Sequence, residues 1–362
     1  MPAGPCAQIC FALSALLSPA LCAAVDDPAS RPPGERPFIG LLLPLNAPEF
    51  SRAAEAVRLG CQAALVFAEN RQSLQVSRTD AQAESILAEY AAAVQRGAAV
   101  IVGPLTRSGV TALAQAGRVS VVTLALNVAD GDMPLPPRLY TFGLSAETEA
   151  RAVARIAFAR GLREGAVVQA SNLLAKRLSR AFADEWFSLG GRISDVREFG
   201  ARADLVDLRR GLADSQAQFI FLAAEADQAR TVRPYLNNQL QVFATSQIND
   251  GKNDPLVNSD LNGIRFVDMP WLVQPDHAAV MVYPRLESLS TELQRFYALG
   301  IDSCRIAGEL IGGQQTINLD GVTGKISYRG GNTLQREPIQ AVFRDGVGVS
   351  LENARENEMK AR

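Results

Sequence analysis

Two apolar runs near the start of the chain end in the same way. Residues 38–43 (Phe-Ile-Gly-Leu-Leu-Leu) lead into Pro44, and residues 98–102 (Ala-Ala-Val-Ile-Val) lead into Gly103-Pro104. An apolar run of this length, followed by a polar loop and a segment of helical period, is typical of a parallel strand buried on both faces. Proline lacks a backbone N–H and cannot continue a sheet, so each strand should end there. Because ligands of open α/β sheets bind beside the carboxyl ends of the strands, the pattern predicts a cleft at this edge.

After these runs the chain alternates between strand and helix patterns. Residues 51–68 place a row of small and apolar side chains, from Ala54 to Leu65, on one helical face. Residues 79–82 (Thr-Asp-Ala-Gln) have the form of a capping box before a helix that ends at Gly97. Further strands are expected at 119–124, 139–142, 165–169, 193–199, 219–223, 241–245 and 264–267. Repeated strand–helix units predict an α/β fold with mostly parallel sheets flanked by helices.

The strand–helix units fall into two groups, which predict two lobes rather than one large sheet. We interpret the proline-rich residues 130–137 as a crossing between the lobes and residues 268–271 (Asp-Met-Pro-Trp) as a second crossing, so that several segments form the hinge. The lobe boundaries are expected at about 38–142 plus 271–312 for the first lobe, and about 143–268 plus part of 313–346 for the second.

The last part of the chain is less regular. Two helices are expected on either side of Gly300. Residues 325–328 and 339–343 are expected to form antiparallel strands joined through a turn at 329–332, and residues 347–362 to form a flexible tail.

The N-terminal residues have the pattern of an export signal. Residues 10–24 are uncharged and apolar over the length of a signal-peptide core, and Cys22-Ala23-Ala24 supplies the small residues that suit cleavage. We therefore predict a signal peptide at 1–24, followed by a proline-rich linker at 25–37. Leu21 stands where a lipoprotein signal needs a small residue, which disfavours lipidation at Cys22, and residues 1–8 contain no Lys or Arg.

Charge and cysteine usage narrow the class of protein further. The net charge is −2 and no Lys/Arg run is present, so binding to nucleic acid or to an anionic membrane is not expected. Beyond the predicted leader the chain has two cysteines, Cys61 and Cys304, which could form a disulfide or remain two buried thiols. With His277 as the single histidine, a histidine-based metal site is excluded, and neither a metal nor another cofactor is expected.

The motifs of common catalytic sites are absent. The sequence contains no G-x-S-x-G elbow, no G-x-x-x-x-G-K-[ST] phosphate loop, and no G-x-G-x-x-G after its opening strands. Glu147 and Glu149 could be a catalytic carboxylate pair, but their place in a helix first turn is a simpler explanation. A binding protein is therefore favoured over an enzyme.

A set of residues at or near the predicted strand ends could line the cleft. Short hydroxyl and amide side chains there suit a small polar ligand, although Ser108 could equally cap a helix and Asn46 could shape a turn. The candidates are Pro44, Asn46, Gly103, Pro104, Thr106, Ser108, Asn127, Tyr140, Phe142 and Ser246.

Several segments resemble a known family. The chain resembles the LppC/LpoA family, whose fold is that of a type 1 periplasmic binding protein, over about residues 38–346. The block at 260–272 (Asp-Leu-Asn-Gly-Ile-Arg-Phe-Val-Asp-Met-Pro-Trp-Leu) is the most discriminating part. The other matching segments are 38–45, 101–105, 140–145, 244–246, 296–302 and 321–324.

The resemblance implies a non-catalytic regulator. Members of this family are outer-membrane lipoproteins that bind a class A (bifunctional) penicillin-binding protein and stimulate peptidoglycan synthesis in the periplasm. In longer relatives a helical-repeat domain precedes this module, whereas here residues 25–37 precede the fold. The alternative is the solute-binding subunit of an amino-acid importer, which would hold a small polar ligand or a peptidoglycan fragment between its lobes.

Overall fold

The computed structural model describes residues 38–68, 72–131, 133–200, 202–314 and 316–353. These residues belong to one compact unit, which spans Pro37–Arg362. The predicted signal peptide at 1–24, with Cys22, and the predicted linker at 25–37 lie outside the described residues.

The first sheet has five parallel strands in the order β2-β1-β3-β4-β5. The two opening apolar runs form β1 and β3, and every residue of β1 is buried. The sequence analysis missed β2, a largely polar edge strand of which Ser77 alone is buried, because an edge strand carries little apolar signal. The strands are β1 (Phe38–Leu43), β2 (Ser73–Arg78), β3 (Ala98–Val102), β4 (Val122–Ala125) and β5 (Leu139–Thr141).

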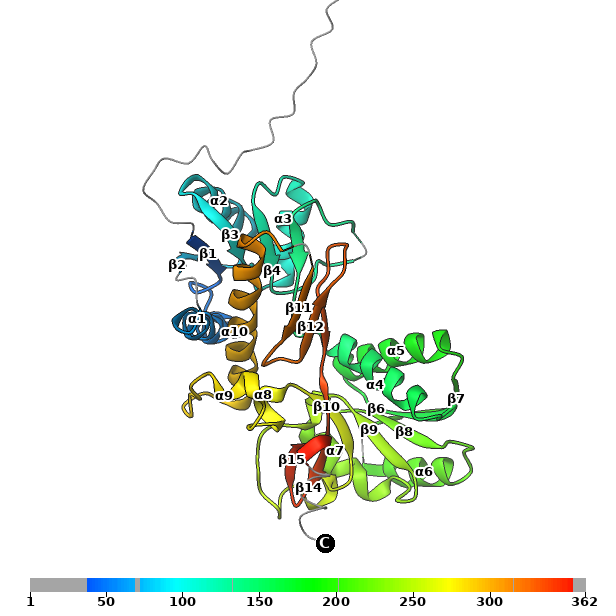
Figure 1. Cartoon of the computed structure of the whole chain (residues 1–362). Helices are drawn as coiled ribbons and strands as arrows, with labels where there is room; N and C mark the ends of the chain where they lie inside the picture. The colour runs from blue at the N-terminus through cyan, green and yellow to red at the C-terminus, as the bar shows by residue number, and fades with distance from the viewer. Residues whose placement is uncertain (1–37, 69–71, 132, 201, 315, 354–362) are drawn as a thin grey trace, which may run out of the picture. The chain divides into compact units, whose positions relative to one another are not determined.

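Helices cover both faces of this sheet (Figure 1). Alternate residues of β1 point to opposite faces, with Ile39 and Leu41 packed in one core and Phe38 and Leu42 in another. The first core includes α1 (Ser51–Val66) and α10 (Thr291–Ile311), and the second includes α2 (Ala83–Gln95) and α3 (Arg107–Ala116). The predicted capping box is wrong, because α2 starts after Gln82, whose side chain forms no cap.

Helices α1 and α10 pack unusually closely. A Cβ on Gly60 would overlap the Tyr297 carbonyl oxygen, and a Cβ on Gly300 would overlap the Val57 carbonyl oxygen. The structure also joins Cys61 of α1 to Cys304 of α10 in a disulfide, with Cα atoms 5.2 Å apart. The prediction of two helices around Gly300 is wrong, since α10 is continuous there and the glycine serves the helix contact.

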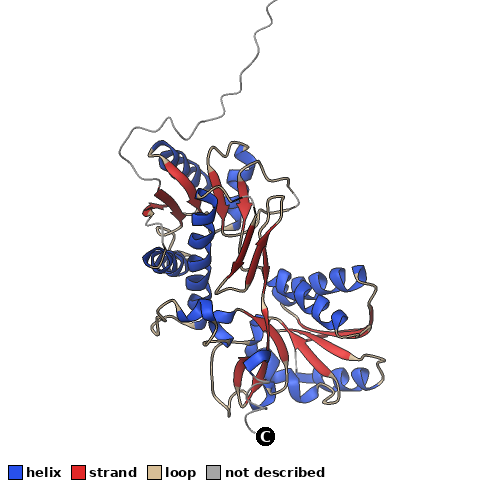
Figure 2. Cartoon of the chain, in the orientation of Figure 1, coloured by secondary structure: helices blue, strands red, loops and turns tan. Residues whose placement is uncertain are grey.

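The second sheet has seven strands in the order β15-β14-β10-β9-β8-β6-β7. Strands β7, β6, β8, β9 and β10 are parallel to one another. Strands β14 and β15 extend the sheet at the β10 edge with antiparallel pairing. Figure 2 shows helices on both faces of this sheet, α4 and α5 on one and α6 and α7 on the other. Its elements are α4 (Ala146–Ala159), β6 (Glu164–Ala170), α5 (Leu173–Ser188), β7 (Arg192–Phe199), α6 (Arg202–Ala213), β8 (Phe219–Ala223), α7 (Ala226–Val232), β9 (Gln241–Ala244), β10 (Arg265–Asp268), β14 (Ile339–Arg344) and β15 (Val347–Ser350).

The tail predicted from residue 347 onward is wrong at its start. Residues Val347–Ser350 pair with β14 as β15, and Gly348 packs beneath the ring of Phe266 in the second sheet. Local sequence gives little signal for so short an edge strand, and its pairing partner decides its conformation.

A third, antiparallel sheet packs on the first lobe. It consists of β11 (Ile317–Asp320), β12 (Lys325–Tyr328) and β13 (Gln335–Glu337), with Ile317 and Ile326 in the first-lobe core. The predicted pairing of residues 325–328 with 339–343 is wrong. The turn at 329–332 leads instead into β13, and β14 belongs to the second sheet.

Three chain segments connect the lobes. They are residues 142–145 between β5 and α4, Met269 between β10 and α8 (Pro270–Val273), and Pro338 between β13 and β14. The crossing predicted at 130–137 is wrong, because this segment joins β4 to β5 within the first sheet. The short helix α9 (Ala278–Met281) follows α8, and no helix in the described ranges is long and apolar enough to cross a membrane.

Candidate functional site

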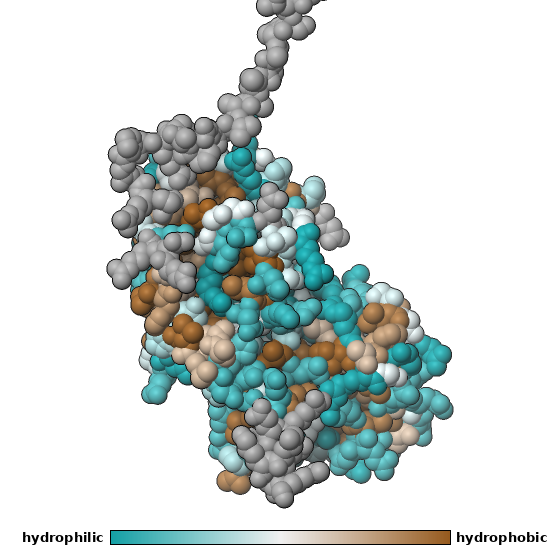
Figure 3. Space-filling model, viewed as in Figure 1, coloured by the Kyte–Doolittle hydropathy of each residue, from teal (hydrophilic) through white to brown (hydrophobic). Residues whose placement is uncertain are grey.

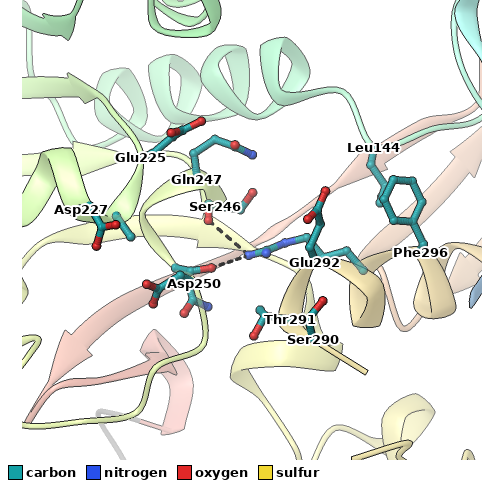
Figure 4. A pocket seen from close by; sticks show the side chains of 13 residues that line it. Leu144, Glu225, Asp227, Ser246, Gln247, Asp250, Ser290, Thr291, Glu292 and Phe296 are labelled. Carbon is teal, nitrogen blue, oxygen red and sulfur yellow. Dashed lines mark hydrogen bonds between the residues drawn. The ribbon is translucent and has the colours of Figure 1, made fainter. Parts of the chain in front are cut away.

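A cavity of about 580 Å³ lies between the lobes, within the size range of small-molecule sites. The second lobe contributes residues that follow β8 and β9, and the first lobe contributes the start of α10 (Figure 4). Leu144, from the first crossing, lies against Phe296 of α10 at one side of the cavity. The remaining lining residues are Glu225, Ala226, Asp227, Ser246, Gln247, Asn249, Asp250, Ser290, Thr291, Glu292 and Arg295.

The charges that line this cavity are mostly negative and mostly paired. Asp227 and Asp250 both bind the guanidinium of Arg230, at 2.6 and 2.9 Å. Arg295 is the one cationic lining residue, and its Nη2 lies 2.9 Å from the Asp268 carboxylate. The same nitrogen donates to the carbonyl oxygens of Ser246 and Asn249 at 3.2 and 3.0 Å. The lining therefore offers no uncommitted cation to the carboxylate of a ligand.

Asp268 lies between the cavity wall and Met269, one of the three segments that connect the lobes. It is the last residue of β10, its side chain is buried, and it accepts hydrogen bonds from Asn249 and Arg295 at 2.9 Å each. Burial raises the pKa of Asp268, and Arg295 opposes that shift because it favours the charged carboxylate. Since Arg295 belongs to the first lobe, this ion pair joins the two lobes beside the hinge.

A second buried ion pair joins the lobes nearby. Arg336 Nη2 of β13 lies 3.0 Å from Glu149 Oε1 of α4, and the two side chains are 3% and 7% exposed. The other Glu149 oxygen accepts from the backbone N–H of Ser246 at 3.1 Å. In both pairs the second lobe supplies the carboxylate and the first lobe the guanidinium. Separating the lobes would break both ion pairs and return their charges to water.

A third ion pair spans the lobes closer to the surface. Glu147 binds Arg177 of α5 and lies 3.8 Å from Arg107, the first residue of α3. Burial tends to raise the pKa of Glu147, but its backbone hydrogen bond and the contacts with Arg177 and Ser145 outweigh this and lower it. Glu147 and Glu149 are thus both held by arginines and do not face a common cavity as a catalytic pair.

The predicted cleft residues are not gathered around this cavity. Of the ten candidates, all of them in the described ranges, Ser246 alone is among the residues that line it. Thr106 caps α3 by accepting from Gly109, and Ser108 donates to Thr106, so the helix cap expected as the alternative role of Ser108 is made by Thr106. Pro44, Gly103, Pro104 and Phe142 are buried, Asn46 accepts from Arg78, Asn127 donates to the Leu105 carbonyl, and Tyr140 packs edge-on against Tyr328.

Sequence reasoning missed the residues that join the lobes. Arg295 and Arg336 lie 27 and 187 residues from their carboxylate partners, so no local spacing connects them. Asp268 lies within the block 260–272 that carried the family resemblance, but nothing around it indicated a buried carboxylate.

A comparison with family models identifies the chain. The model "LppC putative lipoprotein" matches residues 35–346, most of the sequence. The chain belongs to the LppC family. The resemblance noted in the sequence is thereby confirmed, as is the two-lobed α/β fold that it implied.

Two curated relatives of this LppC-family chain carry the same name. This chain is 28% identical to the "Penicillin-binding protein activator LpoA" of Photobacterium profundum, over 87% of this chain and 57% of that protein. The Haemophilus influenzae protein of the same name is 25% identical over 87% of this chain and 55% of its own length. The LppC-family chain therefore spans about half the length of the curated relatives that it matches.

Two solved structures have nearly the same fold. The C-domain of LpoA from H. influenzae, described as a regulator of PBP1A, has a TM-score of 0.73 at 23% identity, and 99% of that domain is covered. A protein from Chromobacterium violaceum, provisionally described as a branched-chain amino acid ABC transporter, has a TM-score of 0.74 at 34% identity, and all of it is covered. The same LppC-family fold thus occurs under two different functional descriptions.

Proposed function

We propose that this chain binds a class A penicillin-binding protein and stimulates peptidoglycan synthesis without catalysing a reaction itself. The observation that carries the proposal is the LppC match over residues 35–346, in a chain whose curated relatives are named activators of penicillin-binding proteins. The match of this chain to 99% of the LpoA C-domain supports the proposal that this module by itself binds the synthase.

The contacts inside the interlobe region support a binding role. Glu147, Glu149 and Asp268 are each engaged by arginines, so none is presented to a substrate as a free acid or base. Two buried ion pairs connect the lobes at the interface between them. Such a module suits a protein partner that recognises its outer surface.

We place this activity in the periplasm. The signal-peptide pattern at 1–24 supports export, and a disulfide between Cys61 and Cys304 suits an oxidising compartment. Tethering to the inner face of the outer membrane would require a lipid at Cys22.

Solute binding is the second candidate, and one observation favours it. The chain is 34% identical to the C. violaceum protein described under amino acid transport, and the match covers 85% of this chain and all of that protein. The cavity of about 580 Å³ is large enough for an amino acid or a peptidoglycan fragment. The engagement of Arg295 by Asp268 weighs against an amino acid, because its carboxylate would lack a cationic partner.

One experiment separates these functions. The chain from Val25 onward is titrated against the periplasmic part of its own class A synthase, while glycan polymerisation and peptide crosslinking are followed. We expect saturable binding and faster synthesis; absence of both would overturn the proposal. Thermal shift assays with amino acids and muropeptides test the alternative, since a ligand that binds only the native state raises the melting temperature.

A further inference from the structure

A shallow groove of about 430 Å³ lies on the first lobe, between α1, the end of β2 and the segment that leads into α10. Its floor is apolar and consists of Leu45, Ala56, Leu59, Leu289 and Leu293. Leu59, Leu289 and Leu293 are half-buried, so parts of their side chains face solvent. Residues at the start of α10 line both the groove and the interlobe cavity. Different residues line each of them, so the two are separate sites.

Two arginines border this groove without an ion pair within 4 Å in the described residues, although the Glu55 carboxylate also attracts Arg78. Within the described ranges Arg52 has no hydrogen bond or ion pair, and Arg78 has one hydrogen bond, from its Nε to Asn46 Oδ1 at 3.3 Å. The carboxylate at the groove, Glu55, is already held by Arg58, whose Nε and Nη2 lie 2.7 and 2.5 Å from its two oxygens. The three arginines and one glutamate leave a local charge of about +2, in a chain whose net charge is −2.

The start of α1 adds to this positive field. The N-cap residue, Phe50, makes no side-chain hydrogen bond, and the first turn contains no acidic residue. The first turn of α1 thus has no acidic side chain at the positive end of the helix dipole, although Glu49 directly precedes the N-cap, and Arg52 lies in that turn. Phe50 is 38% exposed and adds an aromatic side chain beside the charged rim.

We propose that this groove is the docking surface for a segment of the class A synthase that carries an apolar side chain flanked by carboxylates. The proposal rests on the proposed function and names the surface through which it acts. An apolar side chain would cover the leucines of the floor, while the flanking carboxylates would pair with Arg52 and Arg78. Charge complementarity selects an acidic segment, because a neutral or basic one would leave both arginines desolvated without a counter-charge.

A second group of exposed apolar residues lies on the first lobe. Figure 3 shows brown residues on the α1 and α9 side of the first lobe, where Val66, Phe67, Met281 and Val282 are among the exposed apolar side chains. The groove at Arg52 and Arg78 offers both an apolar floor and a charge that specifies the partner.

The test uses charge reversal in the full-length chain. The double variant Arg52→Glu/Arg78→Glu is compared with wild type in binding to the periplasmic part of the synthase. We expect the dissociation constant to rise about tenfold or more, with a weaker salt dependence than wild type. Arg52→Lys/Arg78→Lys keeps the charge and should retain most of the affinity. The matched control, Arg180→Glu/Arg209→Glu, reverses two exposed arginines of the second lobe and should bind like wild type.

A second variant tests the floor. Leu289→Ser is expected to weaken binding several-fold, with its melting temperature recorded so that a folding defect is recognised. If wild type binds the synthase and the Arg52/Arg78 reversal leaves the dissociation constant within twofold, this docking surface is overturned while the proposed function stands. An equal loss in the control pair also overturns it, because general electrostatics would explain the effect. If wild type itself does not bind, both proposals fall.

Discussion

Glu149 accepts a hydrogen bond from Arg336 at 3.0 Å, although 187 residues separate the two in the chain. Glu149 lies in α4 of the second lobe, and Arg336 lies in β13, which packs on the first lobe. Both side chains are almost fully buried, so the pair holds the lobes together beside the hinge. The pair formed by Asp268 and Arg295 also connects the two lobes, as does the longer contact between Glu147 and Arg107.

Removing Arg336 should destabilise the fold strongly. Arg336→Met leaves the Glu149 carboxylate buried without its partner, and we expect a loss of about 3–5 kcal/mol in the free energy of unfolding. The double variant Glu149→Leu/Arg336→Met should recover most of that loss, since no charge remains buried. Urea denaturation measures the free energy of unfolding of the single and the double variant. As a control, Arg155→Ala breaks a surface ion pair with Glu185 and should cost about 1 kcal/mol or less. A loss below 1 kcal/mol for Arg336→Met would contradict this account.

The contact between α1 and α10 predicts opposite effects for two glycines of one helix. Gly300→Ala should cost about 1–3 kcal/mol, because the new Cβ would overlap the Val57 carbonyl oxygen of α1. Gly308→Ala, on the same helix, meets no atom closer than Gln72 Oε1 at 3.9 Å and should stabilise by up to about 1 kcal/mol through helix propensity. Thermal unfolding of the two variants is the measurement, and an equal effect of both would count against close helix packing.

The disulfide between Cys61 and Cys304 should stabilise the first lobe. It closes a loop between residues 243 positions apart, so the double variant Cys61→Ala/Cys304→Ala should lose about 2–5 kcal/mol. Because both cysteines are buried, reduction is carried out on the unfolded chain before refolding. The reduced wild type should then melt near the temperature of the double variant, which reduction should leave unchanged. If fully reduced wild type melts like the oxidised protein, the disulfide is not a source of its stability.

Glu147 should make the stability of the chain depend on pH. Because its pKa is lower in the folded state, its contribution is present above the pKa of an unfolded glutamate and is lost as the pH falls through the folded value. Glu147→Gln should therefore destabilise at pH 7, and the difference from wild type should shrink toward pH 3. Denaturation at both pH values checks the sign, and a difference that grows on acidification would exclude this role.

Much of the fold could be predicted from local pattern. The uniformly apolar runs at 38–43 and 98–102 became β1 and β3, since burial on both faces leaves a signal in each residue. The edge strands β2 and β15 could not be predicted, because they are polar or short and their conformation depends on a neighbouring strand. The same limit applies to Gly300, since a glycine required by another helix is locally indistinguishable from one that ends a helix.

The candidate site was less accessible to prediction than the fold. Of the strand-end residues singled out, Ser246 reached the interlobe cavity, where its backbone bonds to Glu149 and Arg295. Thr106 and Ser108 instead serve the start of α3, which their short hydroxyl side chains suit equally well.

By itself the sequence determined the family, the α/β class and the apolar strands of both lobes, because each rests on residue types and spacings that act locally. The tertiary structure alone decided which charges meet across the hinge, why α1 and α10 need glycines where they touch, and that Arg52 and Arg78 border one apolar groove. Ion pairs and close contacts form between residues far apart in the chain, and their energy depends on burial, which no local pattern encodes.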